Sequence, residues 1–552
     1  MVIQGCDHQD SPVQLHRSPA TLQAHSLGFA PEDRLRKGRR QASQGFHPDE
    51  PCRSDAICPV SPSRQSLRPA RLAPVEVELD TSLFPNSWHV RHIRWSSDSS
   101  RFIFYYNQRG HQVVRMIGAD GQTGKASTLL EEAPDTFVDY AYKTLIRWTR
   151  ENEMIWMSER DGWNHLYLYD MKSGQVKNQI TKGKWVVRGV DWIDHKKRQI
   201  GFRAMGIDSE QDPYHVHHCR IDFDGSNLVR LTKGDGMHEI TYSPDRKYYL
   251  DRYTRVDLPA ITELRRSSDG KKLCTLETAD ISELQKVGWR APERFVAKGR
   301  DGKTDIFGLI YTPSNLDPKR KYPVIERIYA GPHGHHVPKT FRTNWFSHKM
   351  AELGFILVQI DGMGTNWRSR AFHDVCWQNL GDAGFPDRIK WMKAAAKDRP
   401  YMDLDRVGIF GGSAGGQNTL GGMLQFPDFY KVGVADCGCH DNRMDKIWWN
   451  EAWMGWPIGP HYDEQSNVTM AHKLKGKLLL TVGEIDKNVD PASTMQVVNA
   501  LIEANKDFDL VVFPGGGHGI GESPYGKRRR NDFFVRHLHG VEPPPVSKRK
   551  WD

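Results

Sequence analysis

One serine stands among glycines directly after a short β-branched and aromatic run, in RVGIFGGSAGGQNTLGGM, residues 406–423. Gly411 and Gly415 flank Ser413 at two positions on either side, and glycine tolerates the positive φ and close backbone approach of a sharp strand-to-helix turn. Such a turn exposes the serine hydroxyl for nucleophilic attack. Taken alone, the motif is also compatible with a glycine-rich turn capped by a serine, or with a phosphate-binding loop.

A serine hydroxyl is a weak nucleophile near neutral pH, so it requires a base, and the base requires an acceptor that orients it. Asp486 follows the strand-like run in LLLTVGEIDKNVD, and His518 follows the next one in LVVFPGGGHGI. Taken singly, Asp486 is also compatible with a turn residue, and His518 is also compatible with a solvated loop histidine. In the order Ser413, Asp486, His518 they match the α/β-hydrolase triad, and we predict that the three are catalytic.

The anionic intermediate of such a reaction needs hydrogen-bond donors aimed at its oxygen. We expect one from the backbone N–H of Ala414 and a second from the hydroxyl of Tyr329 in RIYAGPHG, for which a core ring with its hydroxyl at the rim is the alternative. No metal and no cofactor are predicted, because neither the Cys437–His440 cluster nor the His215–Cys219 cluster has the paired spacing of a zinc site.

Strand-like and helical segments alternate in the region that must position these residues. After residue 295, near-continuous apolar runs such as FILVQID and KLLLTVG alternate with helical stretches at 386–398 and 491–505. This pattern predicts a mostly parallel, doubly wound sheet covered on both faces, with sites at the carboxyl ends of its strands. We assign residues 295–542 to an α/β-hydrolase domain.

The preceding region has a different texture. Residues 80–290 contain short alternating strands separated by Gly, Asp and Asn turns, with a recurrence of about 45 to 50 residues, which predicts an all-β, partial β-propeller of about four blades. An incomplete propeller would leave unpaired strand edges. Residues 1–75 are rich in Pro, Ser, Gln, His and Arg, and we interpret them as disordered or as a wrongly assigned start of translation.

Composition excludes several classes of protein. The 552 residues exceed what one core accommodates, so at least two domains are expected. The net charge of +9 is spread along the chain, and its denser clusters at 34–40, 527–530 and 548–550 are interpreted as solvated surface or tail rather than a nucleic-acid site. No apolar run is long enough to span a bilayer and no signal-peptide pattern opens the chain, so we expect no membrane partner and, by default, a cytoplasmic protein.

Several ordered motifs resemble the dipeptidyl peptidase IV branch of the prolyl oligopeptidase family, the serine peptidases S9. They are YPVIERIYAGP, DGMG, GGSAGG, WWNEAWMGWP, GEIDKNV and GGGHG in the second region and MSERDGWNHLYLYD in the first, and the likeness covers about residues 85–540. The resemblance implies the same roles for the triad and for Tyr329. It also places Asn488 and Val489 beside the substrate, and Trp449 and Trp453 in the pocket for the residue before the cut.

The sequence also departs from that family. Ala414 and Asn442 stand where dipeptidyl peptidase IV has a tyrosine and a tryptophan, which predicts a pocket of altered shape and leaves a proline preference open. The family holds the substrate amine with two propeller glutamates, whereas we interpret Glu131 and Glu132 as structural. The family's propeller has seven or eight blades. We therefore expect that this sequence is truncated upstream, that the protein forms a homodimer, or that it works with a reduced cap.

The resemblance and the triad together imply a serine peptidase that acts on peptide substrates through an acyl-enzyme, as a dipeptidyl peptidase or an oligopeptidase. An esterase or acylaminoacyl hydrolase is the alternative enzyme, because the same triad cleaves esters. A catalytically impaired binding module is the alternative from a different class, because the propeller is incomplete.

Overall fold

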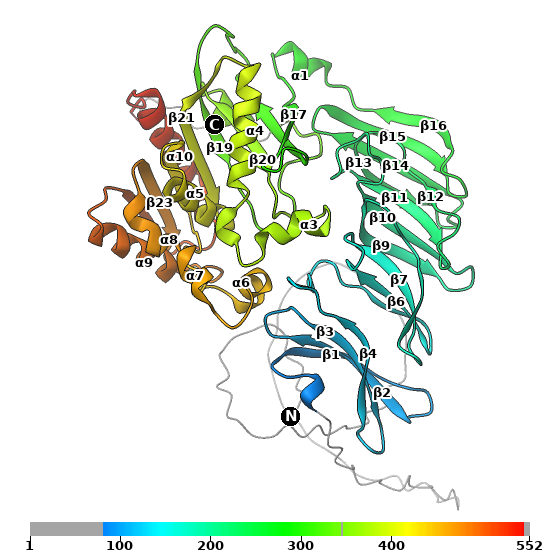
Figure 1. Ribbon diagram of the computed structural model, residues 1–552. Coiled ribbons are helices and arrows are strands. Elements are labelled where there is room, and N and C mark those ends of the chain that lie inside the picture. Colours follow the sequence, from blue (N-terminus) through cyan, green and yellow to red (C-terminus); the bar gives the residue numbers. More distant parts are fainter. Residues whose placement is uncertain (1–80, 344–345, 546–552) are drawn as a thin grey trace, which may run out of the picture.

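The computed structural model describes residues 81–343 and 346–545, which form an all-β array beside an α/β domain (Figure 1). The stretch 1–75, interpreted above as disordered, lies outside the described residues. Among the described residues, no helix is long and apolar enough to cross a lipid bilayer.

Four antiparallel four-stranded sheets follow one another along the chain (Figure 1). Alternation along the strands sends neighbouring side chains to opposite faces, so a sheet can pack on two sides. In β6, Met154 and Trp156 join a core with the first sheet, whereas Ile155 and Met157 join a core with the third. The predicted propeller-like fold class is confirmed. The strands are β1 (Ser87–Trp95), β2 (Arg101–Gln108), β3 (Val114–Asp120), β4 (Ala126–Glu132), β5 (Ile146–Arg150), β6 (Glu153–Ser158), β7 (His165–Asp170), β8 (Gln175–Gln179), β9 (Val186–Asp194), β10 (Gln199–Met205), β11 (Val216–Asp222), β12 (Val229–Arg230), β13 (Met237–Tyr242), β14 (Tyr248–Arg255), β15 (Leu258–Arg266) and β16 (Lys272–Thr278).

An eight-stranded sheet forms the centre of the α/β domain, in the order β17-β18-β20-β19-β21-β22-β23-β24. β18 pairs antiparallel with both β17 and β20, and every pairing from β20 to β24 is parallel. The predicted α/β-hydrolase class, with its mostly parallel sheet, is therefore confirmed. The strands are β17 (Glu293–Lys298), β18 (Asp305–Tyr311), β19 (Tyr322–Arg327), β20 (Ile356–Asp361), β21 (Met402–Gly412), β22 (Tyr430–Asp436), β23 (Lys477–Gly483) and β24 (Asp509–Phe513).

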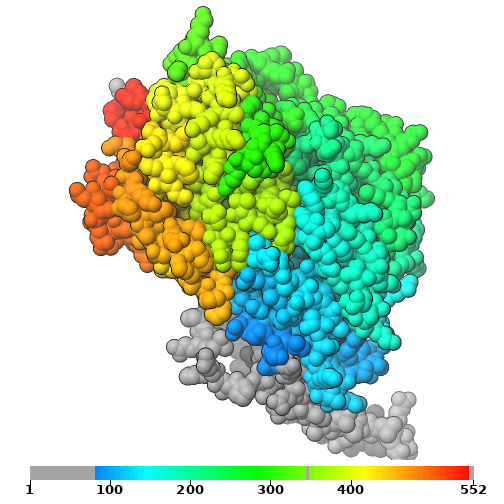
Figure 2. All heavy atoms as spheres, viewed as in Figure 1, coloured from blue at the N-terminus to red at the C-terminus, as the bar shows by residue number. Residues whose placement is uncertain are grey.

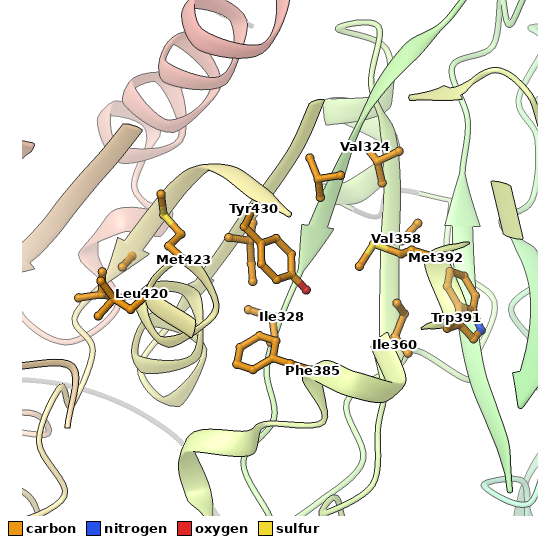
Figure 3. Packing of buried hydrophobic residues seen from close by; sticks show 14 of the residues in the cluster. Val324, Ile328, Val358, Ile360, Phe385, Trp391, Met392, Leu420, Met423 and Tyr430 are labelled. Carbon is orange, nitrogen blue, oxygen red and sulfur yellow. The ribbon is translucent and has the colours of Figure 1, made fainter. Parts of the chain in front are cut away.

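Helices cover both faces of this sheet, because its strands are apolar on both sides. Val324 of β19 packs into the core under α4, α5 and α9, and its neighbour Ile325 packs into the opposite core, under α2 and α10. Figure 3 shows the first of these cores, with Trp391 and Met392 of α4 at one end and Leu420 and Met423 of α5 at the other. The helices are α1 (Ser282–Lys286), α2 (Phe346–Ala351), α3 (Arg370–His373), α4 (Phe385–Lys397), α5 (Ala414–Gln425), α6 (Ile447–Met454), α7 (Pro460–Glu464), α8 (Asn467–Met470), α9 (Pro491–Glu503) and α10 (Pro524–Phe534).

A buried ion pair crosses the first core. Arg388 of α4 donates from Nη1 to Oε1 of Glu326 on β19 at 2.8 Å, and both side chains are fully buried. The hydroxyl of Tyr430 donates to the other carboxylate oxygen of Glu326 at 2.7 Å. Each partner satisfies a charge or a hydrogen bond that burial would otherwise leave uncompensated.

A buried polar cluster fixes the all-β array against the α/β domain, and Figure 2 shows the two parts in contact along this boundary. In the segment that precedes β5, Asp139 accepts a hydrogen bond at 2.7 Å from Nδ2 of Asn366, which follows β20. Nζ of Lys143 in the same segment lies 3.2 Å from Nδ1 of His373 on α3. The segment that carries these residues therefore approaches the carboxyl ends of the parallel strands.

Candidate active site

Ser413 occupies the sharp turn between β21 and α5. Its backbone has φ +59° and ψ −125°, a strained conformation for a residue with a Cβ. A Cβ on Gly411 would lie 2.4 Å from the carbonyl oxygen of Ile328, and one on Gly415 would lie 2.5 Å from the same oxygen. The two glycines therefore permit the close backbone approach that the sequence predicts, whereas the positive φ falls on the serine itself.

Helix α5 begins at Ala414, immediately after the serine. The first-turn amides of an α-helix have no acceptor within the helix, and the helix dipole makes this end positive. The backbone N–H groups of Gly416 and Gln417 turn back to the carbonyl oxygen of Ser413, at 2.8 and 3.1 Å. The amide of Ala414 is not part of this pair of hydrogen bonds, and its role as an oxyanion donor stays a prediction.

Asp486 and His518 form a hydrogen-bonded pair at the ends of β23 and β24. Nδ1 of His518 lies 2.7 Å from Oδ2 of Asp486, whose side chain is fully buried. The other oxygen, Oδ1, accepts hydrogen bonds from the backbone N–H groups of Asn488 at 2.8 Å and Val489 at 3.1 Å. The carboxylate is thereby fixed in place, and it engages Nδ1 of the imidazole so that Nε2 remains for a reacting group.

Ser413 and His518 line the same cavity, of about 620 Å³, together with Tyr329. Burial raises the pKa of Tyr329, and interaction with the Ser413 side chain offsets part of that rise. The phenol therefore keeps its proton near neutral pH and remains a hydrogen-bond donor. We name this space the histidine cavity.

A second pocket, of about 220 Å³, shares Ser413 and Tyr329 with the histidine cavity, and we name it the acyl pocket. Its lining includes six of the nine residues predicted for the site. They are Ser413, Ala414, Tyr329, Trp449, Asn488 and Val489. Side chains and turns far apart in the sequence therefore meet around one hydroxyl.

Trp453 lies elsewhere than the resemblance implies. It is 3% exposed, packs in a core with Phe137, and is not among the described residues that line either cavity. Its ring meets that of Trp449 edge to face, with centroids 4.9 Å apart. The two tryptophans share one face of α6 at i and i+4, but only Trp449 reaches the pocket, because the segment before β5 covers Trp453. Trp453 supports the pocket wall from behind.

Glu131 and Glu132 of β4 are engaged in ion pairs within the first two sheets. Glu131 pairs with Arg115, and Glu132 pairs with Arg160. Neither glutamate is among the described residues that line the histidine cavity or the acyl pocket. This arrangement agrees with the structural role that we expect for both.

The sequence did not reveal four further residues of the site. Tyr142 comes from the all-β array, and Gln417 and Asp445 come from the α/β domain, and all three line the acyl pocket. Cys437 lies beside the histidine, with its sulfur and one ligand atom each of Asp486 and His518 within 4.8 Å of one another. Burial raises the pKa of the Cys437 thiol, which therefore stays protonated. Its position after β22, at the same edge as the serine turn, is the signal that identifies it.

Comparisons with known proteins agree with this fold. The prolyl oligopeptidase family matches residues 341–541, and the dipeptidyl peptidase IV N-terminal region matches residues 64–260, starting earlier than the motifs quoted above. The architecture is thus that of an α/β-hydrolase domain preceded by a propeller-like region. The chain is therefore similar to the prolyl oligopeptidase family over its C-terminal part and to dipeptidyl peptidase IV over the region before it.

Curated relatives include dipeptidyl peptidase 8 of Mus musculus, 27% identical over 414 residues that cover 67% of this chain and 45% of the relative. Probable dipeptidyl-aminopeptidase B of Arthroderma gypseum is 28% identical over 387 residues, which cover 65% of this chain and 40% of the relative. The chain therefore spans less than half the length of these relatives.

Solved structures include dipeptidyl peptidase 4 of Porphyromonas gingivalis, with a TM-score of 0.72 and 25% identity over 84% of this chain and 65% of that one. A putative dipeptidyl aminopeptidase IV from Bacteroides ovatus has a TM-score of 0.71 and 25% identity, over 82% of this chain and 66% of that one.

Proposed function

We propose that this chain is a serine peptidase of the dipeptidyl or oligopeptidase type, with Ser413 as nucleophile, His518 as base and Asp486 as the residue that orients the base. One observation carries the proposal: a fixed carboxylate engages Nδ1 of His518 at 2.7 Å, beside a cavity that also contains the strained Ser413 turn. The names of the relatives, which are dipeptidyl peptidases, support the substrate class.

The reaction follows from these positions. Oγ of Ser413 attacks the carbonyl carbon of the scissile bond while Nε2 of His518 accepts its proton. The negative charge that develops on the carbonyl oxygen is stabilised by the N–H of Ala414 and the hydroxyl of Tyr329. The intermediate then collapses, the C–N bond breaks, and His518 returns the proton to the leaving amine.

Water completes the cycle by attacking the acyl-enzyme. His518 takes a proton from this water, and the acid product leaves as the Ser413 hydroxyl is regenerated by proton return from the imidazolium. Throughout the cycle, Asp486 holds the imidazole in one tautomer and stabilises its charged form.

The two cavities divide the substrate between them. Among the described lining residues, His518 borders the histidine cavity and Ala414 borders the acyl pocket, while Ser413 and Tyr329 border both. Because His518 protonates the leaving amine, that half of the substrate belongs in the histidine cavity. The residue before the cut, which becomes the acyl group, belongs in the acyl pocket.

Chromogenic substrates test the proposal. Dipeptide anilides with free and acetylated N termini are compared with simple esters, using the wild-type chain and Ser413→Ala. We expect amide cleavage that disappears in the variant, and a requirement for the free N terminus would assign the dipeptidyl type. Hydrolysis of esters with no cleavage of any anilide would contradict the peptidase and favour the esterase.

A homodimer remains a prediction. β16 is exposed along its whole length, with Leu276 54% and Leu273 43% exposed, and such an edge favours pairing with another chain. Sedimentation equilibrium of the full chain measures this directly, and a mass of 63.2 kDa at all concentrations would contradict the dimer.

A further inference from the structure

The described lining residues of the acyl pocket include one acidic side chain, Asp445, and two basic ones, Lys446 and His333. Burial lowers the pKa of His333 to about 4, so its imidazole is neutral and Asp445 and Lys446 are the charged pair. They pair with each other, Nζ of Lys446 lying 2.6 Å from Oδ1 of Asp445. Neither residue belongs to the triad or to the oxyanion donors, so the proposed reaction assigns them no role. A pocket that receives a substrate side chain therefore contains a charge pair.

The carboxylate lies deeper than the ammonium group. The Asp445 side chain is 9% exposed, whereas that of Lys446 is 26% exposed. Burial is the main cause of the raised pKa of Tyr329, and the negative charge of Asp445 adds to it. Lys446 stands at the rim, where its long stem can move its head into solvent. Of the two charged groups, the carboxylate is therefore the more buried.

The walls fit a long side chain with a charged end. Trp449 and Val489 supply apolar surface that packs against a methylene stem, and the aromatic rings of Trp449 and Tyr142 attract a cation. The volume of about 220 Å³ accommodates such a side chain. A lysine or arginine before the cut therefore finds both a wall for its stem and a partner for its charge.

The acyl pocket also has an amide side chain in its wall, whereas a pocket for a proline ring would be lined by apolar groups. Gln417 lines it and donates from Nε2 to Oδ1 of Asn442 at 3.0 Å, and Nδ2 of Asn450 donates to the same oxygen at 2.7 Å. An apolar proline ring would offer the Asp445 carboxylate neither a cation nor a hydrogen bond.

We propose that Asp445 makes the acyl pocket selective for a cationic side chain, lysine or arginine, in the residue before the scissile bond. The inference rests on the proposed peptidase function. The incoming ammonium or guanidinium group replaces that of Lys446 as the partner of the carboxylate, and Lys446 moves outward to water.

Anilide substrates that differ only in the residue before the cut test this inference. Lysine is compared with norleucine, which keeps the stem and lacks the charge, and with glutamate, which reverses it, each with a free and with an acetylated N terminus. In the wild type we expect kcat/KM for lysine to exceed that for norleucine about tenfold or more, with glutamate below norleucine. The ratio is expected to approach one in Asp445→Asn and to be retained in the matched variant Lys446→Met.

Equal rates for lysine and norleucine, a preference for glutamate, or a lysine preference that survives Asp445→Asn would each overturn the inference. Loss of cleavage on acetylation without a lysine preference would assign the carboxylate to the substrate's N-terminal amine and overturn it equally. Labelling of Ser413 by a fluorophosphonate distinguishes failure of this inference from failure of the proposed peptidase function. Labelled wild type without selectivity refutes this inference alone, whereas unlabelled, inactive wild type refutes the peptidase.

Discussion

Nδ1 of His518 lies 2.7 Å from Oδ2 of Asp486, although the two residues belong to loops that follow different strands. The carboxylate reaches this position because its second oxygen is held by the backbone N–H groups of Asn488 and Val489. The loop after β23 thus holds the carboxylate of Asp486 in place, and this fixed carboxylate orients the imidazole of His518.

Asp486→Asn is expected to lower kcat for an anilide by about 10⁴-fold. The carboxamide oxygen would remain with the amides of Asn488 and Val489, so its NH₂ group would face Nδ1 of His518. That contact favours the tautomer with a proton on Nε2, which cannot accept the serine proton. The matched control Asp490→Asn should stay near wild type, because asparagine also caps α9 at this position. A small effect of Asp486→Asn in folded protein would contradict the assigned role.

Tyr329→Phe is expected to lower kcat about 10²- to 10³-fold with little change in KM, because the donor acts on a charge that exists only in the transition state. Tyr401→Phe serves as the control for loss of a phenol, because Tyr401 directly precedes β21 and is not among the described residues that line either cavity. Steady-state kinetics on one anilide measure both variants. If KM rose by a similar factor while kcat stayed unchanged, Tyr329 would instead have a role in substrate binding.

Asp139 should make stability depend on pH. Burial raises its pKa to about 6, so the folded state holds a proton that the unfolded chain has released. The contribution of this proton to the free energy of unfolding is therefore fully present below about pH 4. The free energy of unfolding falls by about 3 kcal/mol as the pH rises through about 6. Urea unfolding of wild type and Asp139→Asn between pH 4 and 7 measures the difference. Parallel pH profiles of the two proteins would contradict this account.

Removing one partner of the buried ion pair between Arg388 and Glu326 should lower the stability of the fold. Arg388→Met leaves the carboxylate of Glu326 buried without its cation, and we expect a loss of about 3–5 kcal/mol in the free energy of unfolding. The double variant Arg388→Met with Glu326→Leu should recover most of the loss, because no uncompensated charge remains. Additive destabilisation in the double variant would show that the pair is not coupled.

Local patterns identified the strands that precede the three proposed catalytic residues. Ser413, Asp486 and His518 each follow a run whose apolar pattern identifies a buried strand, and parallel strands bring their carboxyl ends to one edge. The glycines around Ser413 mark the close backbone approach that the turn requires.

Long-range packing determines what the sequence could not reveal. Trp453 and Trp449 share one face of a short helix, and only a segment more than 300 positions earlier in the chain, which contains Phe137, decides which one is covered. Tyr142 enters the pocket because the cluster around Asp139 docks the same segment. No local periodicity in the sequence encodes such contacts between the two parts.

Covalent labelling with a fluorophosphonate, read by peptide mass, tests the central claim most directly. We expect one adduct per chain, on Ser413, that is absent in Ser413→Ala and forms much more slowly in His518→Gln. An adduct on another serine, or no adduct in folded wild-type protein, would contradict the claim that Ser413 is the activated nucleophile.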